Sequence, residues 1–187
     1  DDLAALIYTS GTTGNAKGVM LSHKNLCCNI IIASKTQKTN EKDVWLSILP
    51  MAHTYELSLG VLYPMYAGAK VVYLQKPPTA SILLVALKKV RPTIMLSVPL
   101  IIEKIYKASI LPTIQKSRVL KWMHRNMAGL LYWFVGMRLK NTFGGRIKFF
   151  GIGGAKLNPA VEKFLKKARF NYAIGYGMTE CAPLICT

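Results

Sequence analysis

Short apolar runs alternate along most of the chain with longer stretches in which apolar residues recur at helical spacing. Residues 3–8 form a compact apolar run with the length and composition of a buried strand. In residues 22–39, Leu26, Ile30 and Ala33 share one helical face, and Ser22 is a good N-cap. Short apolar runs predict further strands at residues 44–49, 70–74, 93–98, 146–152 and 172–176. Helical spacing predicts further helices at 55–67, 79–89, from 99 onwards and at 159–168.

This alternation predicts the fold class. Strands separated by helices pair in parallel through crossover connections, so we expect an α/β fold, a mostly parallel sheet with helices on both faces. Residues 110–141 depart from the pattern because six basic and no acidic residues surround apolar Trp122, Leu130, Leu131, Trp133 and Phe134. We expect a basic helical insertion there. The chain begins at Asp1 without a methionine, so we expect residues 1–187 to be one fragment of a larger domain.

Composition narrows the class of protein only in part. A chain of 187 residues, 51% of them hydrophobic, is neither disordered nor low in complexity. Its formal net charge of +17 would ordinarily indicate nucleic acid or an anionic membrane, but in a fragment the acidic regions of the parent can be missing. The four cysteines lack the spacing of zinc sites and predict packing thiols in a reducing compartment.

The basic segment leaves two interpretations open. Basic residues around Trp and Leu are typical of an interfacial helix that binds anionic lipid, and equally of a solvated basic face over an ordinary core. The longest uncharged apolar run, residues 126–137, is shorter than the roughly 20 residues that a bilayer requires. We therefore expect a cytoplasmic protein, with peripheral membrane contact through this segment as the alternative to the ordinary basic face.

Residues 8–18 read Tyr-Thr-Ser-Gly-Thr-Thr-Gly-Asn-Ala-Lys-Gly and carry the first chemical signal. Glycines let backbone N–H groups approach an anion, hydroxyls donate hydrogen bonds, and Lys17 adds a positive charge, which together suit a polyphosphate. The P-loop of kinases and GTPases is excluded, because Ala16 precedes Lys17 and Gly18 replaces the magnesium-binding hydroxyl. The alternative is an ordinary Gly/Thr-rich surface turn.

Three other stretches follow predicted strands. Residues 175–180, Gly-Tyr-Gly-Met-Thr-Glu, offer a ring to stack on a base, a hydroxyl for a phosphate and a carboxylate for a cation. Residues 49–56 read Leu-Pro-Met-Ala-His-Thr-Tyr-Glu, and residues 153–157 read Gly-Gly-Ala-Lys-Leu. His53 is either a ligand-binding or a satisfied structural histidine, and Glu56 either pairs with a cation or caps the following helix.

These motifs resemble the AMP-forming acyl-CoA synthetases and their adenylating relatives. The phosphate loop of that family typically reads Thr-Ser-Gly-Thr-Thr-Gly-x-Pro-Lys-Gly, so Ala16 is a departure from it. Residues 175–180 resemble the second signature, Tyr-Gly-x-Thr-Glu, and residues 153–155 resemble a segment that lines the adenine pocket. Residues 49–53 resemble a Leu-Pro-x-Ala-His segment near the acyl site of the long-chain fatty acyl branch.

The resemblance implies a role for each matching residue. Tyr176 and Gly177, with Gly154 and Ala155, would surround adenine, Thr179 would contact the α-phosphate, and Glu180 would hold Mg²⁺. His53 would lie against the acyl carboxylate, so Lys17, His53, Thr179 and Glu180 are the catalytic candidates. The β- and γ-phosphates would be held by Thr9, Ser10, Gly11, Thr12, Thr13, Gly14 and Lys17.

The implied activity is an ATP-dependent ligase reaction. ATP and a long-chain fatty acid would give an acyl-adenylate and pyrophosphate, and coenzyme A would then displace AMP. The family's C-terminal domain with its catalytic lysine is not among these motifs, so we expect the fragment alone to be inactive. An aryl or amino acid substrate within the same superfamily is the first alternative, and a basic lipid- or nucleic-acid-binding module is the remote one. We expect small-molecule partners and no nucleic acid.

Overall fold

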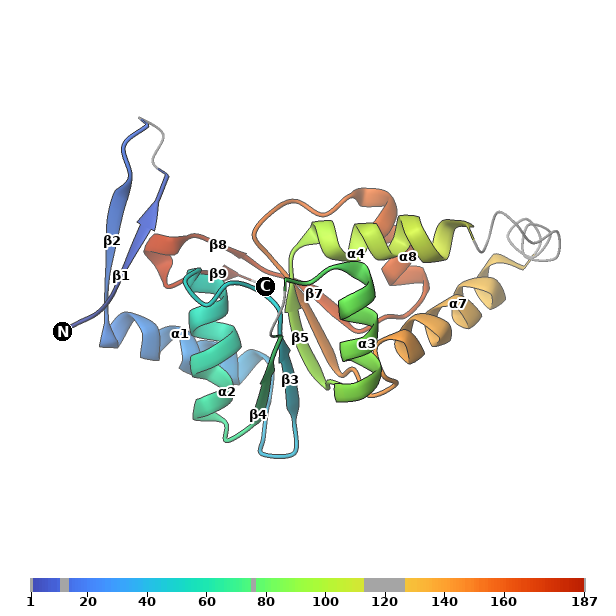
Figure 1. Cartoon of the computed structure of the whole chain (residues 1–187), viewed down its shortest axis with the longest axis horizontal. Helices are drawn as coiled ribbons and strands as arrows, with labels where there is room; N and C mark the ends of the chain where they lie inside the picture. The colour runs from blue at the N-terminus through green and yellow to red at the C-terminus, as the bar shows by residue number, and fades with distance from the viewer. Residues whose placement is uncertain (1, 11–13, 75–76, 113–126, 187) are drawn as a thin grey trace.

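A parallel sheet occupies the middle of the computed structural model, which describes residues 2–10, 14–74, 77–112 and 127–186 (Figure 1). Its five strands lie in the order β4-β3-β5-β6-β7, and every neighbouring pair is parallel. The strands are β3 (Val44–Ser47), β4 (Lys70–Tyr73), β5 (Ile94–Ser97), β6 (Phe149–Ile152) and β7 (Tyr172–Ile174). The predicted α/β class is confirmed.

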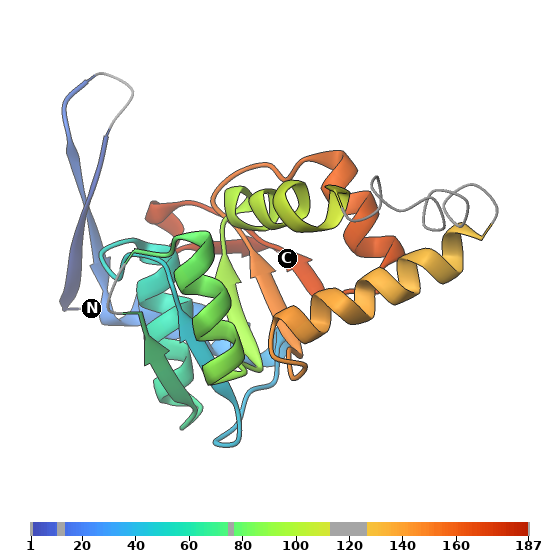
Figure 2. The same ribbon diagram turned by 45° about the vertical axis from the view of Figure 1, so that its right-hand side comes forward.

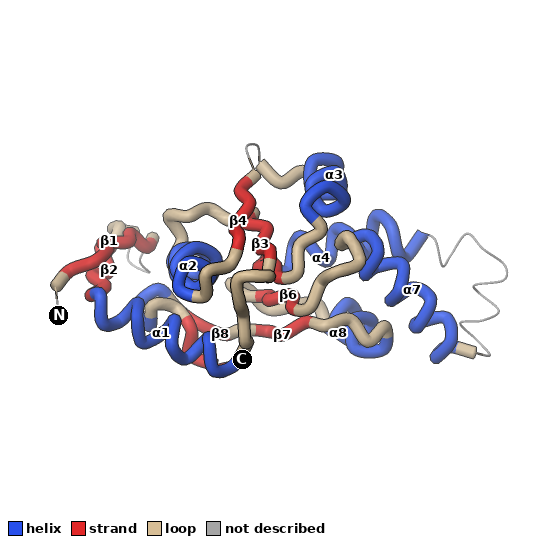
Figure 3. Tube along the Cα trace, turned by 90° about the horizontal axis from the view of Figure 1, so that it is seen from below, coloured by secondary structure: helices blue, strands red, loops and turns tan. Residues whose placement is uncertain are grey.

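Helices cover both faces of this sheet, as Figure 3 shows from below. One face carries α1 (His23–Thr36), the π-helix η1 (Glu56–Leu62) and α2 (Tyr63–Tyr66). The other carries α3 (Ala80–Val90), α4 (Pro99–Ile105), the π-helix η2 (Tyr106–Ile110), α7 (Ala128–Thr142) and α8 (Pro159–Lys167). Successive strand residues point to opposite faces, so Trp45 and Ile94 pack against the first group of helices, and Leu46 and Met95 against the second.

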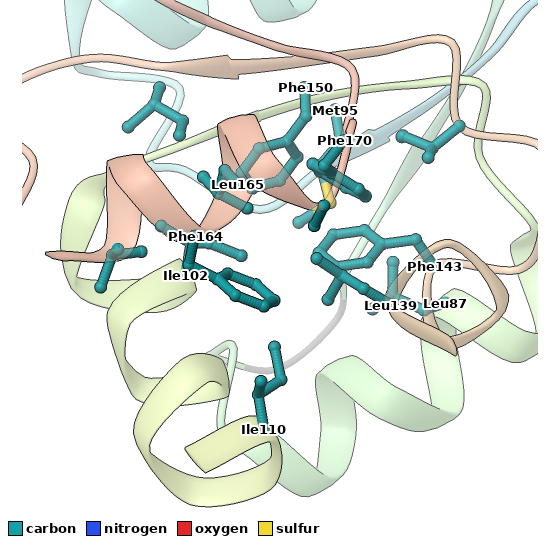
Figure 4. Close-up of a cluster of buried hydrophobic side chains, with 14 of the residues drawn as sticks. Leu87, Met95, Ile102, Ile110, Leu139, Phe143, Phe150, Phe164, Leu165 and Phe170 are labelled. Carbon is teal, nitrogen blue, oxygen red and sulfur yellow. The ribbon is translucent and has the colours of Figure 1, made fainter. Parts of the chain in front are cut away.

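The larger core lies between the sheet and the second group of helices (Figure 4). Phe143, Phe150 and Phe170 form its aromatic centre, with ring centroids 5.2–5.8 Å apart. They come from the end of α7, from β6 and from the segment before β7, so this cluster joins the helix to the sheet. Such pairs favour tilted and edge-to-face geometries because the ring edge is positive and the face negative.

Local signals set most helix boundaries. Ser22 caps α1, as predicted: its Oγ accepts a hydrogen bond from the Asn25 N–H at 3.2 Å, and Asn25 Oδ1 accepts one from the Ser22 N–H at 2.9 Å. Thr79 caps α3 in the same way, and Arg91 ends that helix in the left-handed conformation at φ 50°. Residues 56–62 form a π-helix rather than the expected α-helix, and this register ends just before Pro64, which has no N–H.

The N-terminal segment differs from the prediction. Residues 3–9 form β1 (Leu3–Thr9), which pairs antiparallel with β2 (Lys17–Ser22) in a hairpin projecting from the body (Figures 1 and 2). The strand is present where the sequence predicts it, but its predicted burial is wrong, because Leu3, Leu6 and Tyr8 are 58%, 49% and 69% exposed. Strand β2 was not predicted, since Lys17 and Gly18 leave only three apolar residues in it. Its pairing with β1 across the loop is not visible in the local sequence.

The basic segment is described only in part. Residues 113–126 lie outside the described residues, whereas α7 accounts for most of the remainder. Leu131, Leu139 and Phe143 are buried, and Leu139 and Phe143 anchor the C-terminal end of α7 in the larger core. The assignment of residues 110–141 as an insertion stays a prediction.

Asp43 ties three strands together at their amino ends. Its buried carboxylate accepts hydrogen bonds from Thr93 Oγ1 at 2.9 Å, Lys148 Nζ at 2.8 Å and the Asn40 N–H at 3.1 Å. Burial raises the pKa of this carboxyl, but these hydrogen bonds outweigh it and lower the pKa overall. Because β3, β5 and β6 begin beside Asp43, Thr93 and Lys148, the carboxylate fixes their relative positions.

Replacing Asp43 by Asn should loosen this end of the sheet. Hydrogen bonds to a charged group are worth about 1.5–3 kcal/mol, so we expect opening of β3, β5 and β6 to become easier by about that amount. Hydrogen exchange of their amides in the full-length protein, followed by mass spectrometry, measures this directly. Glu41→Gln, at an exposed acid two residues away, is the matched control. Equal exchange in the two variants would contradict the role assigned to Asp43.

Candidate active site

Two of the predicted site segments follow neighbouring strands of the parallel sheet. Residues 153–155 come directly after β6, and residues 175–176 directly after β7. The Gly153 N–H donates to the Ser97 carbonyl at 3.0 Å, and the Gly175 N–H donates to the Ile152 carbonyl at 2.8 Å. The hydrogen bonds between the strands therefore continue into the first residue of each segment. Gly154, Ala155 and Tyr176 follow adjacent carboxyl ends, where open α/β sheets bind ligands.

Backbone geometry explains the glycines at this edge. Gly154 has φ +84°, a conformation that side chains rarely adopt. Gly177 lies in the short strand β8 (Tyr176–Gly177), which pairs with β9 (Leu184–Cys186). A Cβ on Gly177 would lie 2.1 Å from the Pro183 carbonyl oxygen, so only glycine fits. Tyr176, beside it, is 64% exposed, which leaves ring surface accessible to a planar ligand.

The second motif is held against the base of the hairpin. Thr179, half-buried, and Glu180, exposed, belong to the 3-10 helix η3 (Thr179–Cys181), which packs against β2. Leu21 of β2 and Ala182, next to η3, are buried in one cluster. The Asn29 side chain of α1 donates to the Cys181 carbonyl at 2.7 Å and accepts from the Leu184 N–H at 2.9 Å. Helix α1 thus fixes both sides of the turn that carries Glu180.

The phosphate-loop residues lie at the other end of the hairpin. Thr9 pairs with Lys17, and Ser10, Gly14 and Lys17 are exposed, Gly14 with φ +84°. Gly11, Thr12 and Thr13 lie outside the described residues. Strands β1 and β2 project away from the sheet (Figure 1). The structure therefore places residues 154–155 and 176 at adjacent strand ends and residues 179–180 in η3 against β2, whereas Thr9 and Lys17 pair at the other end of the hairpin.

His53 occupies the exposed turn between β3 and η1. Its N–H donates to the Pro50 carbonyl at 3.0 Å, its carbonyl accepts from the Leu57 N–H at 2.9 Å, and its Nδ1 accepts from the Tyr55 N–H at 3.3 Å. The ring thereby caps the backbone that enters η1. These contacts give His53 the structural role that was one of the two interpretations of the sequence. The ring is also exposed, so its ligand-binding role stays a prediction.

Tyr55, two residues further on, was missed. A Cβ built on Gly151 would lie 3.1 Å from Tyr55 Oη, and one built on Gly153 would lie 3.1 Å from Tyr55 Cζ, so the ring covers the end of β6. Burial, with the nearby Glu56 charge as a second cause, raises the pKa of Tyr55 well above its usual range. Gly151 within β6 and Gly153 directly after it were a partial signal, because glycines there leave room for a neighbouring ring without identifying it.

Two cavities flank this edge. A small one of about 50 Å³ lies between η1 and the sheet, lined among others by Tyr55, Gly151 and Gly175. A large one of about 1070 Å³ lies beyond the ends of β3 and β4, between α3 and α4, with an apolar lining apart from Ser47 and the exposed Lys104 and Lys107. Neither cavity could be predicted, since each is enclosed by segments distant in sequence.

Glu56 is the buried acid of the site region. Its side chain is 1% exposed, and Oε1 accepts a hydrogen bond from Ser47 Oγ at 2.5 Å. Among the described residues, Oε2 has no partner and no cation pairs with this carboxyl. Burial raises the pKa of Glu56 to about 7, with the Ser47 hydrogen bond acting in the opposite direction. Glu56 lies in the first turn of η1, but no side chain caps this helix and the carboxyl contacts Ser47 of β3 instead, so among the described residues it forms neither the expected cap nor the expected ion pair.

The donor set fits a magnesium ion held chiefly by a nucleotide. Within the described ranges, no group of three or more His, Cys, Asp or Glu side chains is placed to bind a metal ion. Glu180, in η3, supplies one exposed carboxylate. Mg²⁺ is usually bound by one or two carboxylates together with substrate phosphates and water, so a single carboxylate here is sufficient.

Comparison with known proteins identifies the family. The AMP-binding enzyme family matches residues 1–187. Long chain acyl-CoA synthetases 6 and 7, both peroxisomal proteins of Arabidopsis thaliana, are 38% and 34% identical over 99% of this chain and 28% of their own length. The structure of o-succinylbenzoate CoA synthetase from Bacillus subtilis with ATP and magnesium superposes with a TM-score of 0.70, at 22% identity over 96% of this chain and 31% of that one.

The chain belongs to the AMP-binding enzyme family, as its motifs indicated. It spans less than a third of the length of these curated relatives, and the solved structure shows a shared fold alone.

The raised pKa of Glu56 predicts that the stability of the fold depends on pH. Its pKa is raised from 4.5 in the unfolded chain to about 7 in the folded one, so the folded state binds this proton more tightly. This group therefore does not change the free energy of unfolding below pH 4.5. As the pH rises from 4.5 to 7, the free energy of unfolding falls by roughly 3 kcal/mol in total. Asp43, whose pKa is lowered, acts in the acidic range below this window.

Glu56→Gln should remove that loss, because the amide stays neutral. We expect hydrogen exchange of η1 and β3 amides, measured across pH 5 to 8 after correction for intrinsic rates, to show a pH-independent opening free energy in this variant. Glu41→Gln, at an exposed acid, should keep the wild-type slope. An unchanged slope in Glu56→Gln would show that this carboxyl does not titrate in the window.

Proposed function

We propose that the full-length protein activates a long-chain fatty acid with ATP, first to an acyl-adenylate with release of pyrophosphate and then to acyl-CoA with release of AMP. The observation that carries the proposal is the meeting of two motifs at one edge. Gly154 and Ala155 follow β6, and Tyr176 follows the neighbouring β7, so groups suited to a base lie at adjacent strand ends. The chain then runs from Tyr176 through β8 to Thr179 and Glu180 in η3, the groups suited to a phosphate and a cation. Long-chain acyl-CoA synthetases among the relatives support the same chemistry.

In the first half-reaction a carboxylate oxygen attacks the α-phosphorus, and the bond to the pyrophosphate oxygen breaks. Tyr176 stacks on the adenine, and the backbone at Gly154–Ala155 borders its edge. The Thr179 hydroxyl donates to an α-phosphate oxygen. Thr9, Ser10 and Lys17, with the rest of the loop, meet the negative charge that grows on the leaving pyrophosphate. A fatty acid is already ionised at neutral pH, so this step requires no general base.

Glu180 would hold Mg²⁺, and the ion would supply positive charge that offsets the negative charge of the phosphates. The thiol of coenzyme A then attacks the acyl carbonyl carbon, AMP leaves, and the thiol proton passes to solvent. Because Thr9 and Lys17 pair at the far end of the hairpin and Tyr176 follows β7, the hairpin must bend over the nucleotide for these residues to contact it together. Loop closure of this kind is common in enzymes that exclude water.

The small cavity behind Tyr55 is the proposed entrance for the acyl chain. Gly151 and Gly175 line it, and they come just before the segments assigned to the adenylate. A chain that continues from the adenylate therefore reaches this cavity first. Its volume of about 50 Å³ is too small for a long chain while the Tyr55 ring is in place, so Tyr55 sets the depth that the chain can reach.

ATP–pyrophosphate exchange by the full-length protein, measured with acids from acetate to palmitate, tests the proposed chemistry. We expect exchange to be largest with long acids, and to fall at least about 100-fold in Lys17→Ala and in Glu180→Ala, a loss typical for groups that stabilise transition-state charge. Lys42→Ala, at an exposed lysine away from the site, is the control. Exchange only with aryl or amino acids would overturn the substrate, and no exchange with any acid would overturn the reaction.

Tyr55→Ala should move the preference toward longer acids, because removing the ring joins the small cavity to the space beside β6. We expect the optimum chain length in the exchange assay to increase, with little change in the KM for ATP. Leu84→Trp, which fills part of the large cavity instead, should leave the profile unchanged. If Leu84→Trp shifts the profile and Tyr55→Ala does not, the chain lies in the large cavity and the assignment to Tyr55 is wrong.

A further inference from the structure

Helix α7 carries an exposed apolar stripe at the end of the molecule opposite the hairpin (Figures 1 and 2). Leu130, Trp133, Phe134 and Met137 are all exposed, although each is large and apolar. With 3.6 residues per turn, these four side chains span about 100° of the helix circumference, which is one continuous stripe. The Trp133 and Phe134 rings are in edge contact, with centroids 5.0 Å apart.

The stripe faces outward because the opposite side of α7 is fixed to the core. Leu131 and Leu139 are buried, and a Cβ on Gly136 would lie 2.1 Å from the Ala168 carbonyl oxygen at the end of α8. The two helices therefore approach at backbone distance at Gly136. Rotation of α7 to bury the stripe would expose Leu131 and break this contact. The outward direction of Trp133 and Phe134 is thus a property of the packed fold.

Basic residues border the stripe on both sides. On the same helical wheel, Arg138 lies about 40° beyond Phe134 and Lys140 about 20° beyond Trp133. Residues 127–148 include no Asp or Glu, so no acidic side chain of this segment offsets these charges. An apolar stripe with Trp and Phe, flanked by long basic side chains, has the chemistry of a helix that lies in the headgroup region of an anionic bilayer.

We propose that α7 is a membrane-docking surface: Leu130, Trp133, Phe134 and Met137 insert at the level of the headgroups, while Arg138 and Lys140 contact anionic lipid. In the described part of the chain no helix is long and apolar enough to cross a bilayer. Within α7, the packing against the core leaves one particular face for this contact. The proposal concerns where the protein acts and is independent of the chemistry proposed for the sheet edge.

Co-sedimentation of the full-length protein with vesicles tests this surface. We expect binding to vesicles of phosphatidylcholine with added phosphatidylglycerol, weaker binding to phosphatidylcholine alone, and loss of the difference at high salt. The double variant Trp133→Ser/Phe134→Ser should bind about tenfold less tightly or worse, because burying one such side chain is worth more than a tenfold step in affinity. Met65→Ser/Tyr66→Ser, an adjacent exposed pair on α2, is the matched control and should bind as the wild type does.

A second pair of variants tests the charges. Arg138→Gln/Lys140→Gln should bind the anionic vesicles about 25-fold less tightly, at about fivefold per residue, with binding to phosphatidylcholine alone unchanged, whereas Lys88→Gln/Lys89→Gln on α3 should bind as the wild type does. Equal binding by the stripe variant and its control, or binding that ignores anionic lipid, would overturn the proposal. A stripe variant that loses thermal stability or changes its oligomeric state would also overturn it, because the stripe would then be covered by protein.

Discussion

The common direction of β3, β5, β6 and β7 is the constraint on which the rest of this structure depends. Because the strands are parallel, each ends at the same edge of the sheet, and the segments that follow them become neighbours although they are far apart in sequence. The turn with His53 and Tyr55 follows β3, Gly154 follows β6, and Tyr176 follows β7. At the opposite edge Asp43 fixes the amino ends of β3, β5 and β6, so the edge that carries the chemistry is positioned from both directions.

Two buried carboxylates, Asp43 and Glu56, lie at opposite ends of β3 and have opposite effects on stability at neutral pH. Asp43 has three hydrogen-bond donors and a lowered pKa, and its role is to hold strands together. Glu56 has one donor, an unpartnered oxygen and a raised pKa, so it costs stability at neutral pH. Buried acids with strongly shifted pKa values cluster at functional sites. Glu56 follows the turn that carries His53 and Tyr55.

The sequence alone was sufficient for the sheet, for most helices and for the motifs at the strand ends, because periodicity and capping are local. The Ser22 cap and the Leu26–Ile30–Ala33 face of α1 appear as predicted. The hairpin was missed because β2 owes its conformation to pairing with β1 rather than to its own composition. The position of Tyr55, the cavities and the outward face of α7 could not be predicted for the same reason, because each depends on contacts between distant segments. Gly136, for example, is explained only by its close approach to the Ala168 carbonyl.

The central claim is that the carboxyl edge of β6 and β7 binds an acyl-adenylate. The most direct test is a crystal structure of the full-length protein with a non-hydrolysable acyl-sulfamoyl adenosine, in which a sulfamate replaces the α-phosphate. The account predicts adenine between the Tyr176 ring and the Gly154–Ala155 backbone, with the sulfamate beside Thr179 and the acyl chain against Tyr55. Adenine bound elsewhere, with Tyr176 and Gly154 free of ligand, would contradict it.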